Sequence, residues 1–504
     1  MNKSTTRMAL SLAPAAVLTL ATGCTADPEP APAKQDLMTA PNVILVLVDD
    51  LGWADLGCFG SEFYETPNLD ALAADGMRFT NAYAACAVCS PTRASIMTGR
   101  CPARVGIMDW IRPLHDPSKW TEEGIRSQSE YVGGKDRRLL TPRVPRWMER
   151  EEITIAEILK GRGYATGFVG KWHLGPEGWF PEDQGFDFNA GGCALGHPPH
   201  YFDPYPPEHQ PSTFPNLPPR EEGEYLTDRE SDEAVGFIRR HADEPFFLYL
   251  CHYAVHSPIQ AKQDLIDHYE AKPKIEGDGQ NYPPYAAMVH SVDDAMGAIL
   301  KTIEELGIAD NTLIIFTGDN GGATHFRATD NRPLRSGKGR PYEGGIREPF
   351  IVRWPGRVKP GTVSDVPIST IDLLPTICEA VGAEVPQDRP IDGLNLLPLM
   401  QGTGTIQRED LYWHFPHYWA GQFVRPYSII RSGDWKLIKH YETGKVELYN
   451  LGDDIGEKND LATAMPEKAT ELAAKLAAWL AGVSEGGAKM PRENPDFQPA
   501  AGGG

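Results

Sequence analysis

The sequence predicts an α/β protein whose doubly wound sheet has helices on both faces and is followed by a small C-terminal antiparallel sheet with one helix. Three observations support this prediction. Short apolar segments recur between residues 41 and 404, and each ends in polar residues. Segments with helical periodicity lie between them, an alternation typical of a sheet covered on both sides. After about residue 405, strand patterns follow one another directly.

The first 24 residues have the features of an export signal. Lys3 and Arg7 precede a short apolar stretch, and A-T-G-C ends at Cys24 like a lipoprotein processing site. The stretch is shorter than the roughly 20 residues that a membrane-spanning helix needs. We expect 1–24 to be a signal peptide, with either a lipid anchor on Cys24 or plain cleavage that removes it. The Pro- and Ala-rich segment 25–40 is then a linker, and the protein is exported to the periplasm, the outer membrane or the extracellular space.

The first apolar segment of the folded part, V-I-L-V-L-V at 43–48, is continuous and largely β-branched. This composition predicts a strand buried on both faces, and it runs directly into Asp49 and Asp50. The pattern recurs at 165–170, 245–250 and 312–316, and helical patterns occupy 67–76, 154–162, 226–241 and 285–306. Ligands of open α/β sheets bind at the carboxyl ends of the strands. The polar residues after these strands are therefore the candidate site.

The rest of the chain divides into loops and a C-terminal subdomain. Segments 107–150 and 196–222 are long and irregular, so we expect them to form walls of a substrate cleft. A subdomain over 405–485 is expected to follow the catalytic domain over 41–404. Its predicted elements are strands at 427–431, 435–441 and 446–451 and a helix at 466–481. Residues 486–504 are expected to be a flexible tail.

The composition argues against some classes of function. The 504 residues have a formal net charge of -21, whereas a nucleic-acid-binding protein usually has a basic face. Eight cysteines in a chain of this length do not form a dense disulfide framework. Cys86 and Cys89 form a C-x-x-C motif, but a zinc ribbon needs a second pair and a thioredoxin-like site would have a different context.

Two predicted strands end in residues that offer hard oxygen ligands, namely Asp49, Asp50, Asp319 and Asn320. Taken singly, each is an ordinary turn residue. Taken together, they predict a Ca²⁺ or Mg²⁺ site rather than a zinc site. His252 and His256 have the spacing of a helical metal pair, but a strand and loop pattern surrounds them, so we do not expect zinc there.

Cationic and titratable side chains occur in the same motifs: Arg93, Arg100, Lys171, His173, His256 and Lys338. A metal ion with Arg, Lys and His describes a site for a tetrahedral oxyanion, either sulfate or phosphate. Cys89 precedes Ser90 and Pro91, and proline is favoured in the first turn of a helix. The N-terminus of that helix would face the anion. The residues alone therefore predict hydrolysis of a sulfate or phosphate ester and leave both open.

Several motifs together resemble the type I, formylglycine-dependent sulfatases of the alkaline phosphatase superfamily. They are P-N-V-I-L-V-L-V-D-D-L-G, T-P-N-L-D-A-L-A-A-D-G, C-S-P-T-R-A-S-I-M-T-G-R, G-K-W-H-L-G, T-G-D-N-G-G and G-K-G-R-P-Y-E-G-G. The resemblance runs in order from about residue 41 to residue 460. It implies an alkaline-phosphatase-like mixed sheet and a place near the arylsulfatase A and N-acetylgalactosamine-6-sulfatase group.

The resemblance also implies roles for the site residues. Cys89, in the motif C-x-P-x-R, would be oxidised to Cα-formylglycine (3-oxoalanine) by a formylglycine-generating or anaerobic sulfatase-maturating enzyme. The modified Cys89 would join Asp49, Asp50, Asp319 and Asn320 in holding one Ca²⁺ ion. Arg93 would steady the aldehyde hydrate, and His173 would be the base for sulfate elimination. The sulfate oxygens would be held by Lys171, His256 and Lys338, the last two also placed to protonate the leaving alcohol.

Arg100 is expected to support the signature helix instead. Thr92 and Gly318 stand where the family more commonly has serine, and neither change removes a ligand.

The implied function is that of a sulfuric ester hydrolase (EC 3.1.6.-) acting on a sulfated carbohydrate or aryl sulfate. One alternative is a phosphate or phosphonate ester hydrolase of the same superfamily, although ligands for a single metal favour sulfate. The other is a non-catalytic sulfoglycan-binding lipoprotein, which would not need its catalytic positions filled. Contact with a membrane is expected only through the anchor at Cys24.

Overall fold

The computed structural model describes Met1 and residues 40–499, except 113–120, 206–213, 215, 218–220, 276–278, 325–327 and 422. The predicted signal peptide and linker lie outside the described residues, apart from Met1 and Ala40. Within the part of the chain that is described, no helix has the length and apolar character needed to span a membrane.

A nine-stranded mixed sheet forms the centre, with β1 (Asn42–Val48) between β8 (Thr312–Gly318) and β7 (Phe246–His252). β1 runs parallel to both neighbours. The order is β10-β2-β9-β8-β1-β7-β5-β6, with β11 paired to β2, and β9 runs antiparallel to β8 and β2. The other strands are β2 (Met77–Tyr83), β5 (Ala165–Gly170), β6 (Phe188–Ala190), β9 (Arg347–Arg353), β10 (Thr362–Ser364) and β11 (Ile368–Ser369).

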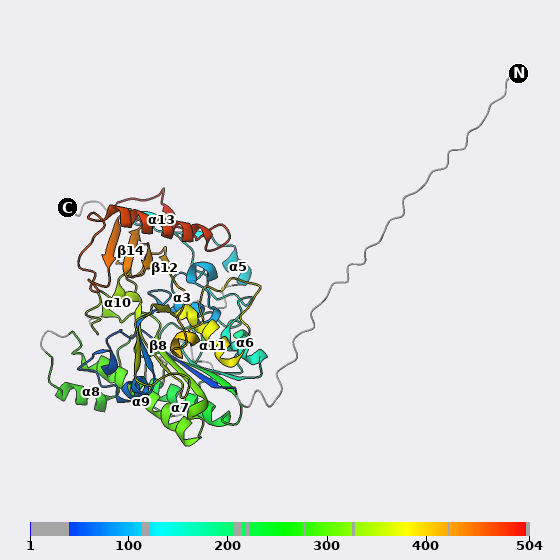
Figure 1. Ribbon diagram of the computed structural model, residues 1–504, viewed down its shortest axis with the longest axis vertical. Helices are drawn as coiled ribbons and strands as arrows, with labels where there is room; N and C mark the ends of the chain where they lie inside the picture. The colour runs from blue at the N-terminus through cyan, green and yellow to red at the C-terminus, as the bar shows by residue number, and fades with distance from the viewer. Residues whose placement is uncertain are drawn as a thin grey trace.

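Alternate residues of β1 enter two separate cores, because successive side chains of a strand point to opposite faces. Ile44, Val46 and Val48 pack with one group of helices, α2 (Pro67–Ala74), α7 (Leu226–Arg240), α8 (Gln263–Ala271) and α9 (Pro283–Glu305). Val43, Leu45 and Leu47 pack with the other, α3 (Cys89–Thr98), α6 (Ile155–Gly161) and α11 (Leu373–Val381). Figure 1 shows α7–α9 and α3, α6 and α11 on opposite sides of β8. The predicted doubly wound sheet is confirmed.

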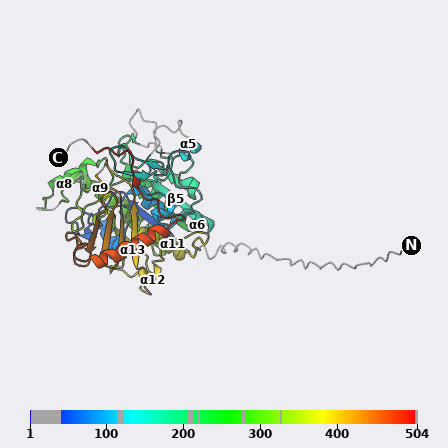
Figure 2. The ribbon, with the colours of Figure 1, turned by 90° about the horizontal axis from the view of Figure 1, so that it is seen from above.

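The C-terminal part is a four-stranded antiparallel sheet of β12 (Asp410–Phe415), β13 (Tyr427–Ser432), β14 (Trp435–His440) and β15 (Val446–Asn450). α13 (Pro466–Gly482) packs on one face through Leu472, Leu476 and Leu480, and Figure 2 shows the helix beside these strands. The other face packs against Tyr83, Cys86, Ala87 and Val88, the segment that leads into Cys89. The predicted sheet and helix are confirmed, and this sheet supports the signature motif from behind.

Short elements complete the fold. They are α4 (Pro102–Val105), α5 (Glu122–Arg126), α10 (Glu343–Ile346), α12 (Leu397–Met400), β3 (Tyr131–Val132), β4 (Leu139–Pro142), β16 (Arg492–Glu493) and 3-10 turns at Gly57–Phe59, Pro181–Gln184, Ala309–Asn311 and Thr370–Asp372. The flexible tail expected over 486–504 stays a prediction, although residues 492–498 make backbone hydrogen bonds with 135–140. β16 pairs with β4, and Asn494 N donates to Arg138 O at 2.9 Å. Backbone groups on 131–142 thus form hydrogen bonds with residues of the C-terminal segment. A local sequence pattern does not predict such long-range pairing.

Lys436 on β14 joins the two parts of the molecule through a fully buried ion-pair network. Its Nζ lies 2.9 Å from Glu343 Oε1 and 2.8 Å from Glu457 Oε1, and all three side chains are 0% exposed. Burial would raise the pKa of Glu343, but Lys436 and Arg347 hold it at about 2. The stabilisation from this carboxylate is therefore fully present above its ordinary pKa of 4.5 and is lost as the pH falls toward 2.

We expect Lys436→Met to lower the free energy of unfolding by about 3–5 kcal/mol, because it removes the cation that Glu343 and Glu457 share and leaves only Glu343 with a second ion pair, to Arg347 at 3.4 Å, among the described residues. Urea unfolding at pH 7 measures this loss. Lys439→Met, on the same strand with its Nζ 5.7 Å from the Tyr441 ring, should change the free energy by less than about 1 kcal/mol. Equal losses in the two variants would contradict the role given to Lys436.

Candidate functional site

The carboxyl ends of three neighbouring parallel strands bring the predicted residues together. Val48 is paired with Gly318 on one side and with His252 on the other. Asp49 and Asp50 therefore leave the sheet beside Asp319 and Asn320. Gly170 of β5 is paired with Cys251, which places Lys171 at the same edge. This convergence is what the strand-end pattern predicted.

An unusual backbone conformation at Asp50 lets two consecutive carboxylates face one pocket. In an extended strand, Asp49 and Asp50 would point to opposite faces, but Asp50 has a φ of 58°. Left-handed φ values are uncommon for residues other than glycine, and they cluster at functional sites. His173 has the same feature, with a φ of 59°. Both residues are held in a conformation that costs free energy and places a side chain in the site.

The signature motif forms α3, and its first residue is Cys89. Cys89 and Arg93 are separated by four residues, so they lie on the same face of the helix. Arg93 Nε donates to Asp319 Oδ2 at 2.9 Å, and its Nη1 donates to the Lys171 carbonyl at 2.6 Å. Val88, the N-cap residue, makes no side-chain hydrogen bond to the helix, so the first amide groups of α3 are not capped by it. The bonds from Arg93 hold the N-terminus of α3 at the strand ends, and both Cys89 and the positive end of the helix dipole lie there.

Burial shields the Cys89 side chain from solvent and keeps its thiol protonated. Cys89 is only 4% exposed, and burial raises the pKa of its thiol although Lys171 and Lys338 favour the thiolate. The described cysteines form no disulfide. The unmodified thiol is therefore protonated near neutral pH.

Each carboxylate of the cluster has a cationic partner in the structure. Lys171 Nζ contacts Asp49, Arg93 contacts Asp319 at 2.8 Å, and Lys338 Nζ contacts Asp50. Three formal positive charges thus meet three negative charges. A divalent cation added to this balanced cluster would make the site positive and favour an anionic substrate.

Oxygen atoms without partners identify where such a cation would bind. Asp49 Oδ1, Asp50 Oδ2 and Asn320 Oδ1 are buried and accept no hydrogen bond, although buried polar atoms normally have partners. Ligand atoms of Asp49, Cys89 and Asp319 lie within 4.8 Å of one another, as do those of Asp49, Asp50 and His256. Burial, then Asp49, raises the pKa of Asp319 despite its contact with Arg93. The predicted oxygen ligands therefore fit a hard cation such as Ca²⁺.

Two histidines lie beside this cluster with distinct hydrogen bonds. His173 Nε2 is 2.7 Å from the Ile111 carbonyl, and a carbonyl can only accept, so Nε2 carries the hydrogen and Nδ1 is left as a basic nitrogen. His173 Nδ1 is buried and has no partner. His256 Nε2 lies 3.6 Å from Asp50 Oδ2. Burial and nearby lysines lower the pKa of both histidines well below 6.5.

The other singled-out residues lie apart from this cluster. Arg100 pairs with Glu152 at 2.5 Å, in agreement with the supporting role expected for it. His252 Nδ1 lies 2.7 Å from Glu230 Oε2, so it does not share a ligand position with His256. Thr92 Oγ1 accepts from Cys86 N at 3.1 Å and thereby fixes the turn before the helix.

Sequence reasoning missed a layer of buried acids behind the cluster. Glu348 on β9 has two buried oxygens without partners, and burial, with Asp319 and Asp50, raises its pKa well above the ordinary value. A Cβ on Gly318 would lie 2.3 Å from Glu348 Oε2, which explains glycine at position 318. Asp55 accepts from Tyr285 at 2.6 Å and from Thr329 at 2.5 Å. No local pattern signals these contacts, because their partners lie far away in the sequence.

Gly170, which precedes Lys171, has a φ of 93°, and an added Cβ would lie 2.0 Å from the Cys251 carbonyl oxygen. We expect Gly170→Ala to lower the free energy of unfolding by at least about 2 kcal/mol, since it combines a left-handed φ with a clash. Its activity should fall as well, because Lys171 moves. Gly161→Ala, at a helical position with nothing within 4 Å, is the control and should be neutral or stabilising. Thermal unfolding measures the stability of the two variants. Equal stability of Gly170→Ala and Gly161→Ala would contradict the steric constraint inferred at Gly170.

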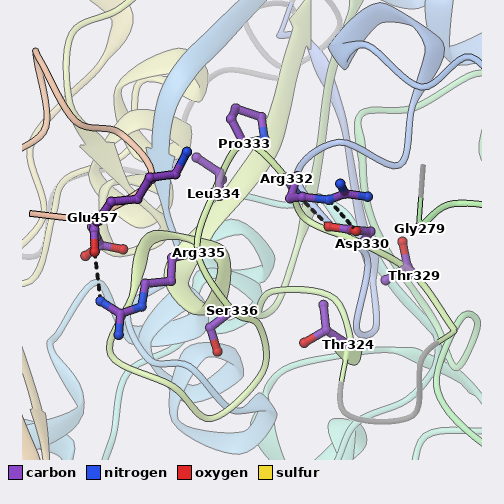
Figure 3. Close-up of a pocket in the computed structure, with 12 residues that line it drawn as sticks. Gly279, Thr324, Thr329, Asp330, Arg332, Pro333, Leu334, Arg335, Ser336 and Glu457 are labelled. Atoms are coloured by element: carbon purple, nitrogen blue, oxygen red, sulfur yellow. Dashed lines mark hydrogen bonds and ion pairs between the residues drawn. The ribbon is translucent and has the colours of Figure 1, made fainter. Parts of the chain in front are cut away.

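A separate cavity of about 720 Å³ lies beside the loop that carries Lys338 (Figure 3). None of the ten predicted site residues is among the described residues that line it. Its arginines are already paired, since Arg332 Nε lies 2.6 Å from Asp330 Oδ2 and Arg335 Nη1 donates to the Glu457 carbonyl at 2.8 Å. This cavity is therefore not the anion site.

Comparisons with known proteins agree with this geometry. The family model described as Sulfatase matches residues 41–383, and a model described as N-sulphoglucosamine sulphohydrolase, C-terminal, matches 338–485. The chain is 35% identical to the N-acetylgalactosamine-6-sulfatase of Homo sapiens over 471 residues, which is 85% of this chain and 82% of the relative. It is 35% identical to arylsulfatase A of Homo sapiens, over 79% of this chain and 74% of the relative.

A solved structure, that of Ps i-CgsB in complex with k-i-k-neocarrahexaose, has a similar fold. It matches with a TM-score of 0.73 at 31% identity, over 87% of this chain and 92% of that chain.

Proposed function

Because this chain belongs to the sulfatase family, we propose that it hydrolyses a sulfate monoester of a carbohydrate through a formylglycine made from Cys89 and a Ca²⁺ ion. The main support is that Cys89, at the N-terminus of α3, shares one buried cluster with Asp49 and Asp319. A nucleophile position, an oxygen-rich cation site and three cationic side chains thus meet at a single point. That combination suits attack on a tetrahedral oxyanion.

The Ca²⁺ ion and the formylglycine would supply the positive charge and the nucleophile of the reaction. Ca²⁺, held by Asp49, Asp50, Asp319 and Asn320, would supply positive charge beside the transferring sulfate. Formylglycine, in its hydrated form, would supply a nucleophilic hydroxyl and a second hydroxyl for the release of sulfate. Arg93 donates a hydrogen bond to Asp319. It would therefore orient Asp319, an expected metal ligand, together with the residue at position 89.

The chain's own side chains then bind the sulfate and move protons. Lys171 and Lys338 each place Nζ at the carboxylate cluster, where they would neutralise the sulfate oxygens. His256, with a 14% exposed side chain, is open to the alcohol half of the substrate, and His256 and Lys338 are the candidates to protonate it. His173 presents a free Nδ1 and would accept the proton that accompanies sulfate release.

A carbohydrate is the proposed substrate class because of the relatives. N-acetylgalactosamine-6-sulfatase is 35% identical, and the matching solved structure was determined in complex with k-i-k-neocarrahexaose. Trp110, whose ring lies 6.3 Å from that of His173, would provide an aromatic surface for a sugar. We also propose export, with a signal peptide over 1–24 and a lipid anchor on Cys24, on the basis of the N-terminal sequence. An aerobic or anaerobic maturation enzyme would be the transient partner that modifies Cys89.

Activity measurements with matched esters test the proposed function. The protein, co-expressed with a formylglycine-generating enzyme, should release sulfate from 4-methylumbelliferyl sulfate and from sulfated monosaccharides and oligosaccharides. The corresponding phosphate and phosphonate monoesters should react at least about 100-fold more slowly in kcat/KM, which is a difference of about 2.7 kcal/mol. Faster hydrolysis of the phosphorus esters would support the phosphohydrolase alternative. Binding of sulfated oligosaccharides without turnover would support the non-catalytic alternative.

A further inference from the structure

A group of arginines without acidic partners lies next to the sulfate site. Arg112, Arg143 and Arg146 come from segment 107–150, and no carboxylate of the described residues forms an ion pair with them. Several other arginines are paired, for example Arg100 with Glu152 at 2.5 Å and Arg104 with Asp392 at 2.7 Å, and single arginines such as Arg240 and Arg357 lie over an aromatic ring. In a chain with a formal net charge of -21, unpaired arginines next to one another need an explanation.

Contacts between these arginines hold like charges close together. Arg146 Nη1 donates to the Arg112 carbonyl at 3.0 Å. Burial, followed by the charges of Arg112 and Arg143, lowers the pKa of Arg146. Asp109 is the buried acid of this segment, and it accepts a hydrogen bond from Trp110 N at 2.8 Å and makes no ion pair with Arg112. An anion bound between these side chains would offset the repulsion between their charges.

A short series of contacts connects Arg112 to His173 of the sulfate site. The Arg112 guanidinium lies 5.4 Å from the centre of the Trp110 ring, and Trp110 lies 6.3 Å from the His173 ring. His173 also bonds to the carbonyl of Ile111, the residue between Trp110 and Arg112. One aromatic ring therefore lies between Arg112 and His173, the expected proton acceptor, and Arg146 is connected to the site through Arg112.

We propose that Arg112 and Arg146 form an anion subsite beside the sulfate site, which binds a second anionic group of the same carbohydrate chain. This inference rests on the proposed function, and it narrows the substrate class. The preferred substrate carries at least two anionic groups, whether sulfate or carboxylate. A singly charged aryl sulfate would use the sulfate site alone.

Direct binding of small polyanions tests this proposal independently of turnover. The probes are sucrose octasulfate, which offers sulfates, and trigalacturonate, which offers carboxylates, measured by calorimetry on the full-length protein. We expect Arg112→Ala combined with Arg146→Ala to weaken binding of at least one probe about tenfold or more, since two charge-assisted contacts are lost. Whichever probe loses affinity identifies the anion that the subsite prefers.

Matched controls separate specific binding from net charge. Arg240→Ala combined with Arg357→Ala removes two exposed arginines that lie over Phe188 and Trp354 and should leave both affinities within about twofold, because these residues are not in the cluster. In the matured enzyme, the Arg112 and Arg146 double variant should hydrolyse 4-methylumbelliferyl sulfate with kcat/KM within about threefold of the unmodified protein.

Unchanged affinity for both probes, or equal losses in the control pair, would overturn the subsite. Absence of sulfatase turnover with intact probe binding would instead overturn the proposed function and leave the subsite standing.

Discussion

Replacing Cys89 by alanine should reduce sulfate release by about four orders of magnitude or more. The change removes the atom that becomes the nucleophile, and loss of a nucleophile has effects of this size in other hydrolases. Cys89 is 4% exposed and lies at the first position of α3, where alanine is well tolerated. The variant should therefore remain folded and keep the other four expected Ca²⁺ ligands, Asp49, Asp50, Asp319 and Asn320. Initial rates with 4-methylumbelliferyl sulfate, together with thermal unfolding, measure both properties.

Cys378→Ala is the matched control for this prediction. Cys378 is also a buried cysteine in a helix, α11, but it lies in the hydrophobic core on the α3 side of the sheet and outside the site. It should keep nearly full activity and lose only about 1 kcal/mol of stability from the small cavity. If Cys89→Ala kept more than about a tenth of the activity, the nucleophile would have to be another group.

Asp319→Asn should lower kcat/KM by roughly 100- to 1000-fold, the size of effect seen when an electrostatic contributor to a transition state is removed. The amide keeps the shape of the side chain but loses the charge that contacts Arg93 at 2.8 Å and that would bind the cation. The variant should also bind Ca²⁺ more weakly. Metal content after dialysis, measured on both proteins, should show one ion per chain of the unmodified protein and less than one for the variant.

Removal of metal tests the same site without a mutation. Treatment with a chelator should abolish activity, and added Ca²⁺ should restore it, because Asp49, Asp50 and Asn320 have buried oxygens without partners. Asp388→Asn is the control, since its side chain is 63% exposed and pairs with Arg389. That variant should behave like the unmodified protein in both assays. Full activity after complete metal removal would contradict the cation site.

Much of the fold followed from hydrophobic pattern alone. β1, β5, β7 and β8 were predictable because their residues are buried on both faces, and each ends in polar residues. β9 was not predicted, since it contains Glu348, Pro349 and two arginines that local sequence would place at the surface. The structure buries all seven of its residues, and long-range contacts such as that between Arg353 Nη1 and the Ala309 carbonyl at 3.3 Å compensate for the polar groups.

The candidate site was largely predictable because its residues follow strands that meet at one edge. The structure brings Asp49, Asp50, Asp319 and their cationic partners into contact, as the strand order requires. The carbonyl of Ile111, which fixes the His173 tautomer, could not be predicted from a side-chain motif. The unpaired arginines of segment 107–150 were also missed, because a charge without a partner becomes evident only when the surrounding chain is in place.

The most direct test of the central claim is the mass of the tryptic peptide Phe79–Arg93, prepared from protein that has been co-expressed with a maturation enzyme and shown to be active. We expect the thiol of Cys89 to be replaced by an aldehyde, while Cys86 in the same peptide remains a cysteine. An active protein in which Cys89 is still an unmodified thiol would contradict the proposed formylglycine chemistry.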